Sequence, residues 1–530
     1  MSFVARRDPA AAAAERTPVP HRSPDIDAAP PFAWGPVSAV VLLAGALFLL
    51  RLDRYEFGGD ELYFIAAGHR PAAGYADQGP LVPLLAALAD HLDPGSAVVL
   101  RLPAVVATLA AIALSAALAR EFGGGLRPQV LAALAYAVTP AAVMQSAMLS
   151  TFAFDATCTA TISWLLIRWV RVRRDPLLVA AGLVAALDVQ VKWLIPVIWA
   201  GLAASVAVLG PREMVRRPAW WLGTGLFAAA ALPGLWWQYT HGWPQFGMSA
   251  VVRDEQLSTS GGLVGMPWQI IMTTGPMGLL LLAGMWAGLR WERLRPYRFL
   301  VPVVVLGLVA VLFAGLRPYF VVGGFPGLFA AGAAYLGRRE FGSGVRAFGV
   351  AVTALATVIT VLAVVALPLS ASHLRPTDAY SQIDWRSRLF GPSGWDDLVA
   401  AVEEARDRLP QQARTRAVIV TQNYWQAAGL EFFGRAAGLP RVYSPNRGYG
   451  YFDPPPDTAN IVLYVGVDAP PGGLGVEFSQ VSVLTRIDRR LGFPSVNRGV
   501  TVWLCLDPHA RWSAVWPGLR TLRLVDGTNR

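Results

Sequence analysis

Apolar segments of membrane-spanning length recur along this chain, and they constrain its fold more than any other feature. A helix needs about 20 predominantly apolar residues to cross the hydrocarbon core of a bilayer, and the pattern predicts about eleven to thirteen such helices. The range arises because Pro140 and Pro196 lie inside apolar segments and can split a helix. The predicted segments are 34–52, 97–119, 127–147, 151–170, 176–191, 192–209, 218–238, 262–289, 298–315, 317–336 and 346–368.

The composition agrees with a multi-pass membrane protein and disfavours a soluble one. Hydrophobic residues make up 54% of the chain and charged residues only 15%, whereas about a quarter of a soluble domain is charged. The formal charge of +10 is compatible with nucleic-acid binding in principle. The Arg residues cluster instead in short loops between apolar segments, which is the pattern of membrane orientation. We therefore expect no nucleic-acid partner.

Arginine-rich loops alternate with loops that carry few basic residues, and this alternation predicts the orientation of the chain. Short cytoplasmic loops carry the excess of Lys and Arg. We therefore expect residues 1–33 to form a disordered cytoplasmic N-terminus, and residues 53–96, 239–261 and 369–530 to lie on the extracytoplasmic side. The Arg-rich loops that this orientation places in the cytoplasm are 120–127, 168–176, 210–218, 290–298 and 337–346.

Residues 369–530 differ in character from the apolar part at residues 34–368 and predict a separate domain. Residues 413–440 predict a strand, a loop and an amphipathic helix ended by a Gly-Leu-Pro sequence. Further strands are predicted at "NIVLYVGV", "FSQVSVLTRI" and "VTVWLCLD". About 160 residues can bury a core of their own. We therefore expect a soluble α/β domain tethered to the membrane part.

An acidic pair, Asp60 and Glu61, interrupts the apolar sequence "FGGDELYF" in the predicted outer loop. One interpretation is structural, because Asp suits the N-terminus of the helix that would follow, and a solvated pair at a span end is equally ordinary. The other interpretation is chemical. A carboxylate at the membrane surface can act as a general base that takes a proton from an attacking hydroxyl or amine.

Lys192, in "VQVKWLIPVI", is the only lysine among the 45 Lys and Arg residues of the chain. Arg presents a planar fork, whereas Lys is a compact point charge that can reach one phosphate oxygen. Its position near the outer end of an apolar segment, where ionisable groups are expensive, favours a phosphate-binding role. The structural alternative is a snorkelling side chain that pairs with Asp188 four residues earlier.

Three more polar residues lie at predicted outer positions. Asp77 and Gln78, in "GYADQGPLVPLLAAL", precede an apolar helix that we expect to lie in the membrane interface. An Asx-turn is the structural alternative at this position. Asp155, in "STFAFDATCTATISW", is near the start of a span on the outer side. N-capping is the structural alternative there to a polar functional site.

His241, Arg317 and Tyr319 lie at the outer ends of later spans. Aromatic-belt anchoring accounts for the tyrosine, but it does not account for Arg317, a cation on the face where basic residues are scarce. The carboxylates and cations that interrupt the apolar pattern therefore map to one predicted membrane face. A charged site beside lipid suits a substrate that is delivered as a lipid phosphate.

Taken in order, these stretches resemble glycosyltransferase family 39, which includes protein mannosyltransferases and lipid A aminoarabinose transferases. The resemblance covers about residues 35–470 and implies a polytopic α-helical membrane protein of the GT-C type with a C-terminal soluble α/β domain. It rests on "GGDELYFIAAGHRPAAGYADQGPLVPLLAAL", "FDATCTATISW", "VQVKWLIPVI", "LPGLWWQYTHGWPQF", "LRPYFVVGGFPGLFAAGA", "GWDDLVAAVEEARDRLP" and "TQNYWQAAGLEFFGRAAGLPRVYSPNRGYGYF".

The resemblance implies an inverting hexosyl- or pentosyltransferase of the plasma (inner) membrane. Its donor would be a polyprenyl-phosphate-linked sugar, and its acceptor a lipid, glycan or protein of the cell envelope. Membrane lipids are the remaining partners, and no nucleotide or flavin is implied. A transporter or lipid flippase is one rival, although transporters show internal repeats and broken mid-membrane helices. A non-catalytic subunit that binds lipid-linked sugar is the second rival.

The resemblance also implies roles for the acidic pair and for the outer cations. Asp60 matches the family's catalytic acidic position, and Glu61 lies beside it in the same catalytic motif. Lys192 and Arg317 match positions that meet the donor phosphate, and Tyr319 matches the aromatic residue of the same "PY" motif. At the position of Arg317, relatives commonly have Lys.

The remaining candidates are implied to bind substrate or metal. Asp77, Gln78 and Asp155 match substrate-binding positions. The sequence "DQGP" departs from the "DQPP" or "EKP" of many relatives, so a phosphate-reading Lys at that turn is missing. Some relatives bind a divalent metal ion, and Asp77 and His241 are the candidate ligands here.

Overall fold

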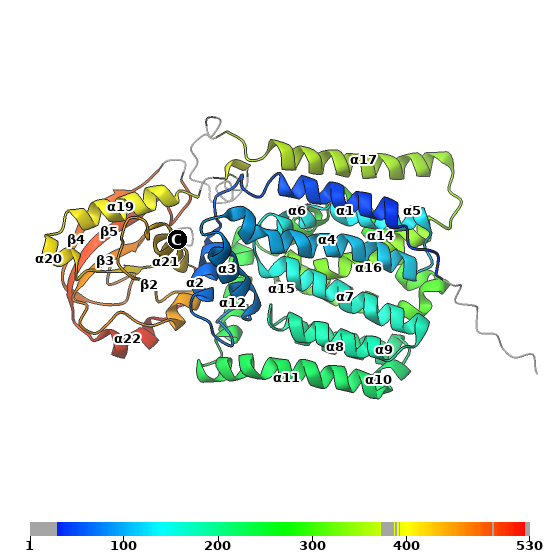
Figure 1. Ribbon diagram of the computed structural model, residues 1–530, viewed down its shortest axis with the longest axis horizontal. Helices are drawn as coiled ribbons and strands as arrows, with labels where there is room; N and C mark the ends of the chain where they lie inside the picture. The colour runs from blue at the N-terminus through cyan, green and yellow to red at the C-terminus, as the bar shows by residue number, and fades with distance from the viewer. Residues whose placement is uncertain are drawn as a thin grey trace, which may run out of the picture.

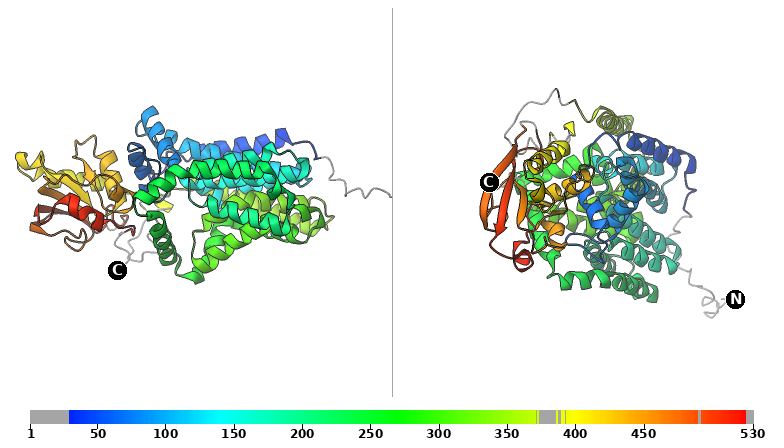
Figure 2. Two further views of the ribbon diagram at one scale, coloured as in Figure 1. Left: turned by 90° about the horizontal axis from the view of Figure 1, so that it is seen from below. Right: turned by 60° about the vertical axis from the view of Figure 1, so that its left-hand side comes forward.

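The computed structural model of the protein describes residues 29–370, 372, 386, 389–391, 393–489 and 492–524. A bundle of roughly parallel and antiparallel helices makes up most of the molecule, and an α/β domain lies at one end of it (Figures 1 and 2). This arrangement confirms the predicted fold class. The bundle helices are α1 (Trp34–Leu49), α4 (Ala97–Glu121), α5 (Leu126–Ala137), α6 (Pro140–Ser146), α7 (Thr151–Val172), α8 (Pro176–Asp188), α9 (Ile195–Leu209), α10 (Glu213–Arg216), α11 (Pro218–Thr240), α13 (Met266–Thr274), α14 (Gly278–Arg290), α15 (Leu300–Ala314), α16 (Phe325–Leu336) and α17 (Ser343–Ala366).

Helix occurs at every predicted apolar segment, but many of the helices are shorter than a full span. In the described part of the chain, four helical segments are long and apolar enough to cross a membrane, or up to five if a bent pair counts as one span. They are Ala97–Glu121, Leu263–Arg290, Pro318–Leu336 and Ser343–Ala366, with α5 and α6 as the bent pair. Five other apolar helices, α1, α3 (Leu81–Leu92), α8, α9 and α15, are only 10–17 residues long.

Proline accounts for two of the breaks, as expected from the sequence. Pro140 begins α6, which turns by 60° relative to α5. Pro196 lies in the first turn of α9, where its missing N–H group has no helical partner to lose. The break between α8 and α9 leaves Lys192 outside regular helix. Bends and breaks of this kind shorten several of the predicted segments, as the range of eleven to thirteen allowed.

The C-terminal domain contains one mixed sheet of five strands in the order β2-β1-β3-β5-β4. Strands β2, β1 and β3 are parallel, whereas β5 pairs antiparallel with both β3 and β4. The predicted strands are confirmed, and the predicted amphipathic helix forms but ends at Phe433, before the Gly-Leu-Pro sequence. The elements are α19 (Trp395–Asp407), α20 (Gln411–Arg414), β1 (Val418–Thr421), α21 (Tyr424–Phe433), β2 (Val442–Tyr443), η7 (Arg447–Tyr451), β3 (Ile461–Gly466), β4 (Phe478–Ile487), β5 (Val500–Pro508) and α22 (Trp512–Leu519).

The α/β domain is docked on the bundle through a shared hydrophobic core. Helices α2 (Gly59–Gly68), α3 and α12 (Pro244–Ser260) lie at the junction (Figure 1). One cluster of buried residues includes Leu62 from α2 and Leu430 from α21. Arg70 forms a two-pronged ion pair with Glu431 across the junction, with N–O distances of 2.9 and 3.0 Å. A second cluster lies within the domain itself, so the domain has its own core in addition to the shared one.

The Arg-rich loops meet at the end of the bundle opposite the α/β domain (Figure 1). Glu121 at the end of α4 is buried and pairs with Arg168 and Arg171 at 2.9 and 2.6 Å. Arg338 donates a hydrogen bond to the carbonyl of Gly123 at 3.0 Å. The basic loops therefore share one end of the molecule, as their alternation along the sequence predicts.

Candidate functional site

The acidic pair lies in the first turn of α2, directly under the α/β domain. Gly58 is the N-cap of α2, and Glu61 accepts a hydrogen bond from its backbone N–H at 2.9 Å. An acidic first turn is favoured because helix N-termini carry partial positive charge. Asp60 is not the N-cap, so the capping interpretation does not account for its side chain. Asp60 and Glu61 point into different surroundings.

Asp60 is held by two side chains from the α/β domain. The hydroxyl of Tyr424 and the indole N–H of Trp425 donate to Asp60 Oδ1 at 2.6 and 2.9 Å. Asp60 Oδ2 accepts no hydrogen bond from the residues that the structure describes. Trp425 reaches this position because the neighbouring residue is Gly59, where a Cβ atom would lie 2.3 Å from the indole.

The Tyr424 hydroxyl stays protonated and can therefore donate its hydrogen bond to Asp60. Burial, together with the negative charge of Asp60, raises the pKa of Tyr424 well above its usual range. Asn423 caps α21 and forms a capping box with Gln426, which fixes the start of the helix on which Tyr424 lies. The hydrogen bond to Asp60 is therefore built into the fold of the domain.

Glu61 forms a buried ion pair, and both of its carboxylate oxygens accept hydrogen bonds within the protein. Arg101 on α4 donates to both of its carboxylate oxygens at 2.8 and 2.7 Å, and both side chains are at most 2% exposed. The backbone N–H of Leu149 donates a further hydrogen bond at 2.9 Å. The same guanidinium donates to the carbonyls of residues 52, 55 and 56. These contacts indicate that Glu61 anchors α2 and the loop before it.

Asp77 and Gln78 lie beside α2 in a loop that docks on the break between α8 and α9. Asp77 accepts a hydrogen bond from the Tyr63 hydroxyl at 3.2 Å. Burial raises the pKa of Asp77 to about 6, an effect that Arg447 opposes and Asp60 reinforces. Gln78 is 2% exposed, and its side-chain N–H₂ group has no hydrogen-bond partner.

The departure "DQGP" has a steric explanation at its third residue. The backbone N–H of Gly79 donates to the Val191 carbonyl at 3.2 Å, and a Cβ atom at Gly79 would lie 2.2 Å from the Gln190 carbonyl oxygen. Only glycine fits such a close approach between two backbone segments. The contact places this loop next to Lys192.

Lys192 lies over two aromatic rings and donates a hydrogen bond to one of them. Its Nζ atom is 4.4 Å from the ring centroid of Tyr319 and 4.2 Å from that of Phe320, within cation–π range. It is 3.4 Å from the Tyr319 hydroxyl. No ion pair within 4.0 Å joins Lys192 to Asp188 among the residues described, although the Lys192 backbone N–H donates to the Asp188 carbonyl at 2.8 Å and the two charges interact electrostatically. Both carboxylate oxygens of Asp188 are buried without a hydrogen-bond partner.

Arg317 belongs to a network that leads back to Asp60. Its guanidinium is 3.6 Å from Glu255 on α12, and Glu255 also forms an ion pair with Arg447. Arg447 donates to the Tyr424 hydroxyl at 3.3 Å, and that hydroxyl donates to Asp60. Residues from α2, α12, the loop before η5 (Pro318–Gly324) and the α/β domain thus form one connected polar cluster at the junction.

Asp155 and His241 form no hydrogen bond with this cluster among the described residues, although Asp155 interacts electrostatically with Lys192. Asp155 is 2% exposed, one of its oxygens has no hydrogen-bond partner, and the N-cap of α7 is Ser150, so N-capping does not explain it. His241 stacks on Trp237 with ring centroids 4.1 Å apart and donates from Nδ1 to that residue's carbonyl oxygen.

The suggested divalent metal at Asp77 and His241 does not fit this geometry. Asp77 contacts Tyr63, whereas His241 is held against its own helix. The described residues contain no group of three or more His, Cys, Asp and Glu side chains arranged as metal ligands. We therefore assign no step of the chemistry to a metal ion at these residues.

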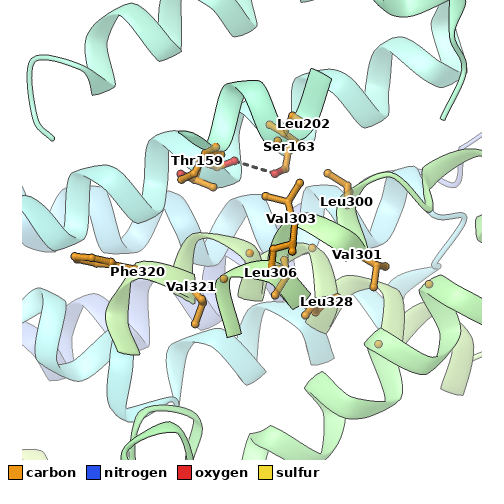
Figure 3. Close-up of a pocket in the computed structure, with 18 of the residues that line it drawn as sticks. Thr159, Ser163, Leu202, Leu300, Val301, Val303, Leu306, Phe320, Val321 and Leu328 are labelled. Atoms are coloured by element: carbon orange, nitrogen blue, oxygen red, sulfur yellow. Dashed lines mark hydrogen bonds between the residues drawn. The ribbon is translucent and has the colours of Figure 1, made fainter. Parts of the chain in front are cut away.

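An apolar cavity of about 380 Å³ lies between α7, α9, α14, α15 and α16 (Figure 3). Phe320, one of the rings under Lys192, is part of its lining. The only polar side chains that Figure 3 labels there are Thr159 and Ser163, and Ser163 donates to the Thr159 carbonyl at 2.9 Å. The cavity is therefore suited to an apolar chain whose polar end lies near Lys192.

Tyr424, Trp425, Arg447 and Glu255 are the site residues that sequence reasoning missed. Tyr424 follows the carboxyl end of β1 and Arg447 follows β2, and these strands are parallel neighbours. Ligands of α/β sheets bind at this edge. If the carboxyl ends of the parallel strands had been predicted to face the membrane part, the sequences "NYW" and "NRGY" that follow these ends would have been placed at the site.

Comparison with known proteins relates the chain to glycosyltransferases. Residues 77–237 match the family described as dolichyl-phosphate-mannose-protein mannosyltransferase. No curated protein matches the sequence significantly. The structure is similar to ArnT from Cupriavidus metallidurans in the apo state, with a TM-score of 0.57, 15% identity and coverage of 89% of this chain and 98% of that one.

Two further solved structures are similar. ArnT from the same organism bound to undecaprenyl phosphate gives a TM-score of 0.57 at 16% identity, again with 89% and 98% coverage. The Archaeoglobus fulgidus oligosaccharyltransferase AglB, in complex with an inhibitory peptide and a dolichol-phosphate, gives a TM-score of 0.47 at 13% identity. In that comparison, 75% of this chain and 64% of AglB are covered. The likeness to ArnT establishes the fold.

Proposed function

We propose that this chain, a multi-pass membrane protein of glycosyltransferase family 39 with the GT-C fold, moves a sugar from a polyprenyl-phosphate donor to a cell-envelope acceptor. The observation that carries the proposal is the setting of Asp60, whose Oδ1 is fixed by two donors while Oδ2 is open. The undecaprenyl phosphate bound to the similar ArnT structure supports a lipid-phosphate donor. The Arg-rich loops at the opposite end of the bundle support transfer on the extracytoplasmic face.

Asp60 acts as the general base in this proposal. The acceptor hydroxyl or amine approaches Asp60 Oδ2, gives up its proton to that oxygen, and forms a bond to the anomeric carbon of the donor sugar. The bond between the anomeric carbon and the phosphate oxygen breaks on the opposite face, so the configuration inverts. The lipid phosphate leaves with the electron pair of the broken bond. Tyr424 and Trp425 act as positioning residues, because their hydrogen bonds to Oδ1 aim Oδ2 at the acceptor.

Lys192 and Arg317 neutralise the negative charge that develops on the departing phosphate, where fixed cations lower the barrier most. Tyr319 holds the Lys192 ammonium through its hydroxyl and its ring. The lipid chain continues into the apolar cavity that begins at Phe320. Asp77, Gln78 and Asp155 are proposed to bind the sugar or the acceptor, since each offers a buried polar atom or a protonatable carboxyl group near the site.

The experiment that tests this function uses membranes that contain the chain, a labelled polyprenyl-phosphate sugar and an envelope extract. We expect label to move from the lipid to the envelope fraction, and a nucleotide sugar alone to give no transfer. Movement of intact labelled lipid across the membrane without cleavage would indicate a flippase. Binding of the lipid without any transfer would indicate a non-catalytic subunit.

Tyr424→Phe and Trp425→Phe are each expected to lower kcat by about tenfold or more, because each removes a hydrogen bond to a charged group, worth about 1.5–3 kcal/mol. KM should change little for Trp425→Phe, since the donor contacts remain, whereas Tyr424→Phe also removes a hydrogen bond that Arg447 donates, so its KM is expected to rise as well. Single-turnover and steady-state transfer rates measure the effect. Tyr443→Phe, in the same domain and without a contact to Asp60, is the control. A variant that raises only KM would contradict the positioning role.

Asp77 is expected to make stability depend on pH. Its pKa is raised from 3.8 to about 6 in the folded state, so the folded protein binds more protons than the unfolded chain between these values. The contribution of Asp77 to the free energy of unfolding is therefore largest below pH 3.8 and declines as the pH rises to about 6. The Tm of the wild type should fall relative to that of Asp77→Asn across this window. A constant Tm difference would show that Asp77 titrates normally.

A further inference from the structure

One carboxylate, Glu255, lies between two guanidinium groups from different parts of the chain. Its Oε1 forms an ion pair with Arg447 of the α/β domain, and its Oε2 is 3.6 Å from Arg317 at the end of the bundle. The side chains of Arg447 and Glu255 are 8% and 15% exposed. These three side chains alone sum to a net charge of +1, and Asp60 is a further anion that interacts electrostatically with both arginines.

Arg447 is fixed by its surroundings and would keep its position without Glu255. Its backbone has a φ of 46°, a conformation that is costly for a residue other than glycine. Its Nε donates to the Leu522 carbonyl at 3.1 Å and its Nη1 to Tyr424 at 3.3 Å. Arg317, by contrast, has a buried Nε–H that makes no hydrogen bond to any residue in the described part of the chain. An anion at this position would therefore meet the fixed guanidinium of Arg447 and the unused Nε–H donor of Arg317.

Glu255 is held less firmly than the arginines that it bridges. It lies on α12, which buries only Pro244 and Met248 among its residues. Apart from the arginines, its recorded contact is the backbone N–H of Leu524, which donates at 3.1 Å. Displacing the Glu255 carboxylate therefore breaks its ion pairs with Arg447 and Arg317 and its hydrogen bond from Leu524, whereas its helix makes few buried contacts.

We propose that Arg317 and Arg447 form an anion site in which the Glu255 carboxylate stands where oxygens of the lipid phosphate bind. The inference rests on the proposed function and adds Arg447 and Glu255 to the phosphate site. The donor is a phosphodiester with one negative charge, whereas the lipid phosphate monoester that leaves carries about −1.5 to −2 at pH 7. After transfer Asp60 holds the acceptor proton and is neutral, so with Glu255 displaced the two arginines match that charge and the product is bound more tightly than the donor. Glu255 returns as the product leaves.

The test compares Glu255→Gln with Asp254→Asn, which removes the same charge from an exposed neighbour on the same helix. Binding of a polyprenyl monophosphate and of the uncharged polyprenol is measured by calorimetry on the full chain in lipid nanodiscs. Glu255→Gln should bind the monophosphate about tenfold more tightly, because a competing like charge is gone. Its affinity for polyprenol, and both affinities of Asp254→Asn, should equal those of the wild type.

A second variant keeps the inference falsifiable if Glu255→Gln does not fold. Arg447→Gln should bind the monophosphate about tenfold more weakly and polyprenol normally. Unchanged monophosphate affinity in either folded variant would overturn the inference while leaving the proposed function intact. Failure of the wild type to bind the monophosphate at all would overturn the proposed function as well.

Discussion

Asp60→Asn is expected to lower kcat for sugar transfer by about 10²–10⁴-fold, the usual contribution of a general base. The amide keeps the shape of the side chain and can still accept hydrogen bonds from Tyr424 and Trp425 on its oxygen. It cannot take a proton from the acceptor. Transfer of label from a polyprenyl-phosphate sugar to the envelope fraction measures the loss, and donor binding measured separately should be almost unchanged.

Asp53→Asn is the matched control for this experiment. Asp53 lies in the same outer loop, is exposed, and makes no ion pair with any residue that the structure describes. Its replacement changes the net charge equally and should leave transfer at the wild-type rate. Wild-type transfer by Asp60→Asn would remove Asp60 from the role of base and would direct attention to Asp77, the other carboxyl group beside α2.

Glu61→Gln is expected to lower the free energy of unfolding by about 3–5 kcal/mol, because it leaves the buried Arg101 charge without its partner. Thermal unfolding of the purified protein in detergent measures the change. The double variant Glu61→Gln/Arg101→Met should lose less than the sum of the single losses, since no unpaired charge remains.

The same variant separates a structural role for Glu61 from a catalytic one. If Glu61 only anchors α2, the folded fraction of Glu61→Gln should transfer sugar at a rate close to that of the wild type per folded molecule. A variant of normal stability with no transfer would instead make Glu61 a catalytic carboxylate beside Asp60. The geometry favours the anchor, because Arg101 and backbone N–H groups occupy both carboxylate oxygens.

The membrane part of the fold was largely predictable because its signal is local. Apolar length, proline and the alternation of Arg-rich loops gave the positions of the helices and the grouping of the basic loops at one end. Lys192 was predictable for the same reason, since a single lysine in an Arg-rich chain is visible without a structure. The structure brings Lys192 into contact with Tyr319, and the phosphate role that we expected of both residues stays a prediction.

The partners of the acidic pair were not predictable from local sequence. Tyr424 and Asp60 are 364 residues apart, and Arg101 and Glu61 are 40 residues apart. No periodicity links such positions, because the contacts arise from docking the α/β domain and from packing α4 against α2. Only the family resemblance singled out Asp60 over Glu61 as the candidate base, since adjacent acids look equivalent in local sequence until their neighbours are known.

The hydrogen bonds from Tyr424 and Trp425 to Asp60 also have a consequence for biosynthesis. Asp60 leaves the ribosome early, whereas the residues that aim it are made only after the whole bundle. Domains generally fold as units and in order of synthesis. If Asp60 is the base, as we propose, a chain arrested before α21 would lack the two hydrogen bonds that position it, and transfer would begin only once the α/β domain has been made and has docked.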